Sequence, residues 1–199
     1  MAGYRTVLAG WGVAAALLAA MAGGAAAADG SGSRLAALFG GPWTLTAVDD
    51  GRTVTEASWK GEVVVLYFGY LSCPDLCPTQ LQTIAEALEQ LGPDAGRVRP
   101  LFVSVDPERD GAARIAAFTA QFHSRILGLT GTPEEIARIA RAYRVSYQKV
   151  GSGPTYAIDH SVAVYLIDPD GRTAAVLGPD TTADAMAAAI RSVMRASHP

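Results

Sequence analysis

The chain has 199 residues, which suits one domain with additional segments at its ends. Hydrophobic residues make up 50% of it, so a buried core can form, and the net charge at pH 7 is −3. The basic residues are scattered, which argues against a nucleic-acid-binding surface. The composition fits a soluble, mildly acidic domain.

Residues 1–28 differ from the rest of the chain in composition. Arg5 precedes a run of small and apolar residues that ends in Ala26 and Ala28, the positions that a signal peptidase reads. Residues 7–28 carry no charge and could also span a membrane, which takes about 20 residues. We therefore predict either a cleaved signal peptide or an uncleaved anchor. Both export the remainder, which would be periplasmic, either free or tethered to the inner membrane.

After a predicted linker at 29–41, strand and helix patterns alternate through a domain at 42–199. Predicted strands lie at 44–48, 52–54, 62–68, 98–105, 126–129, 145–150, 161–167 and 173–177. Predicted helices lie at 79–91, 112–122, 132–143 and 182–194. This alternation indicates an α/β sandwich around a mixed but mostly parallel central sheet. A cysteine motif between a buried strand and a helix indicates a thioredoxin-like fold, here with an N-terminal hairpin and a late β-hairpin.

Cys73 and Cys77 are the only cysteines, and three residues separate them. On a helix, residues four apart share a face, so two such sulfurs could converge on one ion. Thiolates are soft ligands that favour Cu(I) and Zn. The motif also lies at a predicted helix N-terminus, which favours the thiolate. The pair could therefore bind a metal, exchange disulfides or form a disulfide.

A metal site would need a third ligand, and histidine is the candidate. His160 precedes a predicted buried strand whose start comes close to the cysteine loop in a thioredoxin-like sheet. His123 lies near a helix end, where a solvated or capping role is expected, and His198 is next to the C-terminus. Asp159 could either orient the His160 imidazole or be an ordinary solvated or capping carboxylate.

The chain resembles the Sco/SenC family of copper-handling proteins from about residue 41 onward. The resemblance rests on the segments 67–78 (YFGYLSCPDLCP), 102–110 (FVSVDPERD), 128–133 (GLTGTP), 159–160 (DH) and 168–171 (DPDG). It implies an anchored or exported thioredoxin-like domain that binds one copper ion, Cu(I) or Cu(II), through Cys73, Cys77 and His160. It also implies a role in maturing the binuclear copper site of cytochrome c oxidase subunit II.

The partners implied are that subunit or another copper-site protein, with a periplasmic copper donor or a thiol reductant as further candidates. Two functions stay open: a copper metallochaperone, which is not an enzyme, and a thiol–disulfide oxidoreductase that reduces the cysteines of the copper site. The three-residue spacer and the third ligand favour the metallochaperone. The absence of a Trp-Cys-Gly-Pro-Cys motif, and of a proline beside His160, favours it too.

Residues around this motif carry further expectations. Asp106 and Asp110 are interpreted as capping residues ahead of the helix at 112, although the family has an acidic patch here. Tyr70 is expected to be in the core or to line the site. The glycine-rich loop at 151–156 is expected to be mobile.

Overall fold

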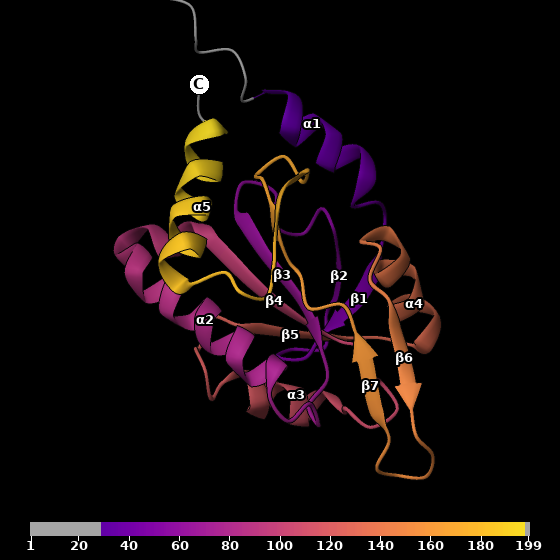
Figure 1. Cartoon of the computed structure of the whole chain (residues 1–199). Helices are drawn as coiled ribbons and strands as arrows, with labels where there is room; N and C mark the ends of the chain where they lie inside the picture. The colour runs from indigo at the N-terminus through magenta and orange to yellow at the C-terminus, as the bar shows by residue number, and fades with distance from the viewer. Residues whose placement is uncertain (1–28, 198–199) are drawn as a thin grey trace, which may run out of the picture.

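The structure, a computed structural model, describes residues 29–197 (Figure 1). Its strands are β1 (Thr44–Ala47), β2 (Thr53–Thr55), β3 (Val63–Gly69), β4 (Val98–Ser104), β5 (Leu127–Thr130), β6 (Tyr147–Val150), β7 (Ala157–His160), β8 (Val164–Ile167) and β9 (Thr173–Leu177). Its helices are α1 (Asp29–Leu38), α2 (Leu76–Leu91), α3 (Ala112–Thr119), α4 (Pro133–Ala142) and α5 (Ala183–Ala196), with a 3-10 helix, η1 (Gly92–Arg97).

Seven strands form the central sheet in the order β2-β1-β5-β4-β3-β8-β9. Only the β3–β4 and β4–β5 pairs are parallel, and the other four pairs are antiparallel. The predicted α/β fold with a mixed sheet is confirmed, as are both hairpins, β1–β2 and β8–β9. The expectation of a mostly parallel sheet is wrong. The two hairpins, the β1–β5 pair and the β3–β8 pair are antiparallel, and hydrophobic runs alone do not reveal strand direction.

The core lies on both faces of β3 and β4. Every residue of β3 is buried, as its continuous apolar run predicts for a strand covered on both sides. The helices α2 and α5 pack side by side over one face, and α1 and α4 lie on the other side of the sheet (Figure 1). A capping box at Thr132 and Glu135 begins α4, which lies within the helix predicted at 132–143.

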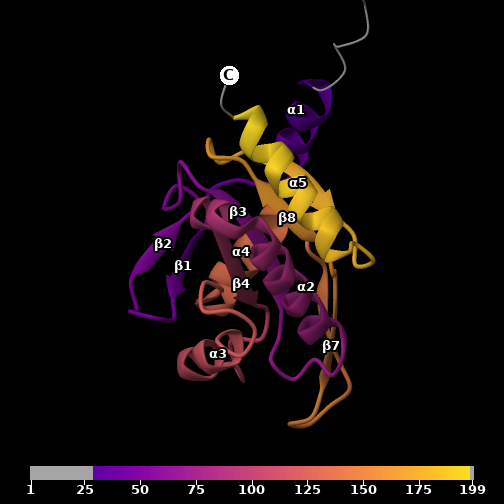
Figure 2. The ribbon, with the colours of Figure 1, turned by 90° about the vertical axis from the view of Figure 1, so that its left-hand side faces the viewer.

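The hairpin formed by β6 and β7 is a separate two-stranded sheet. It projects from the end of the molecule opposite α1 in both views (Figures 1 and 2). The sequence prediction placed a strand at 161–167 and assigned none to residues 157–160, whereas β7 occupies Ala157–His160 and β8 begins only at Val164. His160 is therefore the last residue of this projecting hairpin rather than the residue before a sheet strand.

The predicted linker at 29–41 is largely helical, because α1 occupies its first ten residues and packs against β9. Its end is held by hydrogen bonds from Arg144 Nε to Leu38 O (2.8 Å) and from Thr173 Oγ1 to Phe39 O (3.0 Å). The predicted signal peptide or anchor at 1–28 lies outside the described residues. No helix within residues 29–197 is long and apolar enough to cross a membrane.

Candidate metal centre

The cysteine loop joins the carboxyl end of β3 to the N-terminus of α2. Carboxyl ends of strands are the usual place for ligand sites in open α/β sheets. Because α2 begins at Leu76, Cys77 lies in its first turn, while Cys73 is in the preceding loop. Their spacing had suggested that the two cysteines share one face of a helix. They do not, because only Cys77 is in the helix. A turn closed by the hydrogen bond from Cys73 N to Tyr70 O (3.3 Å) helps to fold Cys73 back toward Cys77.

The structure brings the three predicted ligands together. One ligand atom from each of Cys73, Cys77 and His160 lies within 4.8 Å of the others. Cys77 Sγ is 3.4 Å from His160 Nε2. Neither cysteine is in a disulfide, and both are buried, with Cys73 at 9% exposure and Cys77 at 0%. Two sulfurs and an imidazole nitrogen at this separation can hold one soft metal ion.

Gly69, the last residue of β3, leaves space for the Cys77 sulfur to pack against the backbone. A Cβ atom at this position would lie 2.9 Å from Cys77 Sγ and 2.8 Å from the ring of Phe102. Contacts below 3.0 Å are essentially not seen for real Cβ atoms. Glycine at the end of the strand therefore lets the sulfur pack directly against the backbone.

The His160 ring is oriented by the main chain. Its Nδ1 lies 2.8 Å from the carbonyl oxygen of Ser161, which can only accept a hydrogen bond. The proton is thus on Nδ1, and the Nε2 lone pair faces Cys77. Burial lowers the pKa of His160 below its ordinary value, which favours the neutral, ligating imidazole. Asp159 is exposed and does not hold the ring, so the interpretation of Asp159 as the orienting group is wrong.

Electrostatics around Cys77 differ from the sequence expectation. Burial raises the pKa of Cys77 to about 12, and a backbone hydrogen bond from Tyr70 only partly opposes it. The loss of hydration thus outweighs the stabilisation of a thiolate by the helix N-terminus. Metal binding at Cys77 would therefore displace a proton from its thiol.

Asp106 and Asp110 are almost fully buried, at 2% and 1% exposure. Neither caps α3, whose N-cap is Gly111 without a side-chain cap bond, so that interpretation is wrong. Asp110 Oδ2 instead accepts hydrogen bonds from Leu71 N (2.9 Å) and Ser104 Oγ (2.7 Å). It therefore ties the cysteine loop to the end of β4.

Three further residues lie near the site, and only one of them was predicted from the sequence. Tyr70 is buried in the core and lies edge to face against the His160 ring, with centroids 5.8 Å apart, so its predicted place is confirmed. Arg109 and Tyr156 were not recognised as belonging to the site. The adjacency of Arg109 to two buried aspartates was the one available clue, since buried carboxylates need partners.

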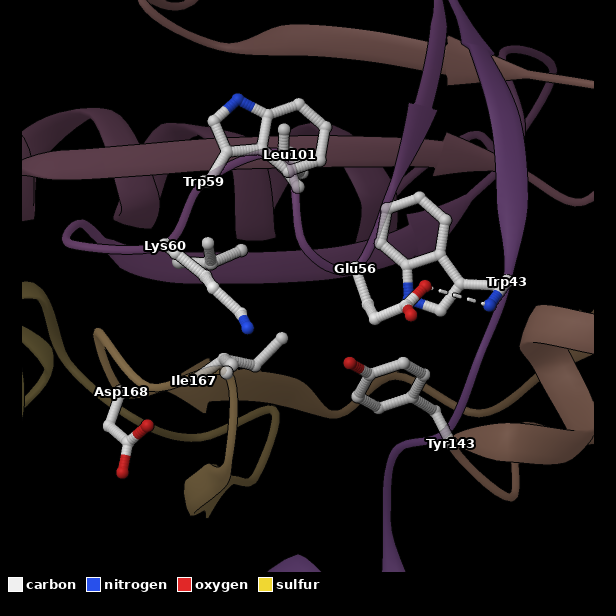
Figure 3. Close-up of a pocket in the computed structure, with 10 residues that line it drawn as sticks. Trp43, Glu56, Trp59, Lys60, Leu101, Tyr143, Ile167 and Asp168 are labelled. Atoms are coloured by element: carbon white, nitrogen blue, oxygen red, sulfur yellow. Dashed lines mark hydrogen bonds between the residues drawn. The ribbon is translucent and has the colours of Figure 1, made fainter.

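The remaining histidines and the pocket lie elsewhere. His123 Nε2 is 3.4 Å from Glu89 Oε1, and its Nδ1 accepts from Arg125 N, so it is not brought to the cysteines. His198 is outside the described residues. A small pocket near the amino-terminal end of β3 lies between Trp43, Trp59 and Tyr143 (Figure 3). Its volume of about 10 Å³ has room for roughly one water molecule.

The chain is similar to known proteins in both sequence and structure. Residues 31–195 match the sequence profile of the SCO1/SenC family. The protein SCO1 homolog 1, mitochondrial, of Arabidopsis thaliana is 43% identical over 136 residues, which are 67% of this chain and 40% of that protein. The chain spans about half the length of the curated relatives it matches.

Two copper-bound structures are similar across the domain. Arabidopsis thaliana ScoI with copper bound has a TM-score of 0.74 and 38% identity, covering 79% of this chain and 99% of that one. Bradyrhizobium japonicum ScoI with copper bound has a TM-score of 0.72 and 40% identity, covering 78% and 99%. These likenesses also confirm the thioredoxin-like fold predicted from the sequence.

Proposed function

The chain belongs to the SCO1/SenC family, and from that premise we propose that it is a copper metallochaperone that holds one copper ion at Cys73, Cys77 and His160. The observation that carries the proposal is that the three ligand atoms lie within 4.8 Å of one another. Two thiolates and an imidazole suit Cu(I). Solved relatives with 38% and 40% identity are copper-bound, which supports copper rather than zinc.

Transfer would proceed by exchange of ligands with a partner. Cys77 is fully buried, whereas Cys73 is slightly exposed and His160 is half-buried. An incoming thiolate would therefore displace Cys73 or His160 first and Cys77 last. The partner we propose is the binuclear copper site of cytochrome c oxidase subunit II. The proposal includes export of the domain, with residues 1–28 as the signal peptide or membrane anchor.

A second function uses the same two thiols. Cys73 and Cys77 are free and close together, which favours a thiol–disulfide oxidoreductase. The pair would give two electrons and two protons to a partner disulfide and become a disulfide itself. Cys77 is fully buried, so the attacking thiolate in this role would be the more exposed Cys73.

Titration of the reduced chain with Cu(I) tests the first function. We expect a 1:1 complex whose affinity falls at least about tenfold in His160→Ala, because one of three ligands is lost. His123→Ala is the matched control and should bind as the unaltered chain does. Absence of stoichiometric copper, together with rapid turnover of a disulfide substrate by a dithiol, would favour the second function instead.

A further inference from the structure

The hairpin that carries His160 has little support of its own. Within residues 29–197, the strands β6 and β7 pair only with each other. Ile158 is the only buried residue in the two strands. Hydrogen bonds between Ser146 and Ser161 close its base. The placement of His160 over the thiols therefore depends on contacts between the hairpin and the rest of the molecule.

Arg109, from the loop between β4 and α3, makes several such contacts. Its Nη1 donates to Tyr156 O (2.8 Å) and Pro154 O (3.3 Å), in the turn that connects β6 to β7. Its guanidinium carbon lies 3.5 Å from the centroid of the Tyr156 ring, a close cation–π contact. These contacts hold the glycine-rich loop at 151–156 against the body, where the sequence had suggested a mobile loop.

Asp106 fixes the direction of Arg109. Its Oδ2 accepts from Arg109 Nε, and its Oδ1 accepts from the Tyr156 hydroxyl at 2.7 Å. A guanidinium can serve a carboxylate and two carbonyls at once because its five N–H groups form a planar fork. We call Asp106, Arg109 and Tyr156 the clamp. It joins a buried carboxylate of the body to the residue just before β7.

The same loop also contacts the segment that carries the two cysteines. Asp110 binds Leu71 N in the cysteine loop. The guanidinium of Arg109 is 6.0 Å from the centroid of the Tyr70 ring, which itself packs edge to face on His160. One five-residue loop, 106–110, thus contacts both the cysteine loop and the turn of the hairpin that carries His160.

We propose that Arg109 is a positioning residue that, through the clamp, holds the β6–β7 hairpin so that His160 Nε2 stays beside the two cysteine sulfurs. The inference rests on the proposed copper function. It assigns to Arg109 an effect on copper affinity that is exerted only through His160. Lysine cannot replace it, because a single ammonium does not span one carboxylate and two carbonyls.

A double-mutant cycle on the reduced chain tests this effect, with Cu(I) affinity measured for the unaltered chain, Arg109→Gln, His160→Ala and the double variant. We expect Arg109→Gln to weaken binding about tenfold, as supporting groups of metal ligands commonly do. In the His160→Ala background the same change should alter affinity by less than about twofold. Equal weakening in both backgrounds, or none in either, overturns the proposal.

Two further comparisons separate positioning from general damage. Arg125→Gln is the matched control, since half-buried Arg125 also donates to two carbonyls, Val98 O (2.9 Å) in β4 and Gly96 O (3.3 Å) in η1. It should leave copper affinity unchanged. Arg109→Lys should weaken binding like Arg109→Gln, and it keeps the test available if Arg109→Gln does not fold.

Hydrogen exchange on the copper-free chain gives a result that does not depend on the proposed function. We expect Arg109→Gln to speed exchange of the cross-strand amides of β6 and β7 about tenfold, and Arg125→Gln to leave them unchanged. If the unaltered chain binds no copper but this exchange effect is seen, the proposed function fails while the positioning of the hairpin stands. Unchanged exchange in Arg109→Gln overturns the positioning role.

Discussion

Gly69 illustrates how one residue shapes the site. It ends β3 under the sulfur of Cys77, and an added Cβ would collide with that sulfur and with Phe102. Phe102 is fully buried in the core, so its ring cannot move away cheaply. The close approach of backbone and sulfur is thus a requirement of the site.

The corresponding prediction concerns Gly69→Ala. We expect a loss of about 1–3 kcal/mol in the free energy of unfolding, since overpacking a core costs this much, and weaker Cu(I) binding because the Cys77 sulfur is displaced. Urea unfolding and copper titration measure the two effects. Gly96→Ala is the control, because a Cβ there meets nothing within 4 Å. A Gly69→Ala chain as stable as the Gly96→Ala chain would contradict this reading of the packing.

The stability of the fold should respond to the buried carboxyl of Asp110. Burial raises the pKa of Asp110 above 3.8, although hydrogen bonds from Leu71 and Ser104 oppose the shift. Above pH 3.8 the folded chain therefore binds more protons than the unfolded one. The stability contributed by this group is full below that pH and is lost as pH rises through the folded pKa.

We expect Asp110→Asn to lack this loss. Between about pH 4 and about pH 7, the difference in free energy of unfolding between the two chains should shift in favour of the variant. Urea unfolding at several pH values measures the shift, with the exposed Asp94→Asn as control for the loss of one carboxyl group. A difference that stays constant with pH, or shifts toward the unaltered chain, would count against the assignment.

Residue types were the most predictable part of the site. The spacing of Cys73 and Cys77 and the later His160 could be singled out from the sequence, because few side chains bind soft metals. The hydrogen-bond partner of the His160 ring could not be predicted from the sequence. Ser161 acts through its main-chain carbonyl, and any residue at that position would provide the same atom.

At the scale of elements, the end of α4 carries backbone strain. Arg144 has φ 54, the left-handed region that non-glycine residues adopt at a cost of about 1–2 kcal/mol. The hydrogen bonds from Val145 N to Ala140 O (2.8 Å) and from Arg144 N to Arg141 O (3.1 Å) form a Schellman motif around it. The side chain of Arg144 bonds to Leu38 O and so links this turn to α1.

Arg144→Gly and Arg144→Ala separate these two features. Both lose the bond to Leu38, but only glycine relieves the strained backbone. We therefore expect the glycine variant to be more stable to urea than the alanine variant by about 1 kcal/mol. Equal stability of the two variants would show that the conformation at position 144 is not strained in solution.

Strong hydrophobic periodicity in the sequence predicted the positions of most helices and strands. The wrong boundaries occur where that periodicity is weak. The boundaries of β3, β4 and α5 lie within two residues of the predictions. By contrast, β7 was not predicted, because four residues are too short a pattern to mark a strand, and the strand predicted at 161–167 begins three residues before β8. The helix α2 begins at Leu76, three residues before the predicted start at 79.

At the scale of the whole molecule, the site gathers three distant segments. The cysteine loop, the loop 106–110 and the end of the β6–β7 hairpin meet near the carboxyl ends of β3 and β4. The sequence predicted two of these segments as parts of the site. The loop 106–110 was missed as a link because its contacts with residues near 156 depend on tertiary packing, which no local pattern encodes.

X-ray absorption at the copper edge of the Cu(I)-loaded chain tests the central claim most directly. The account predicts one copper per chain with two sulfur neighbours and one nitrogen neighbour, and loss of the nitrogen in His160→Ala. Copper surrounded by sulfur alone, or a nitrogen signal that persists in His160→Ala, would contradict it.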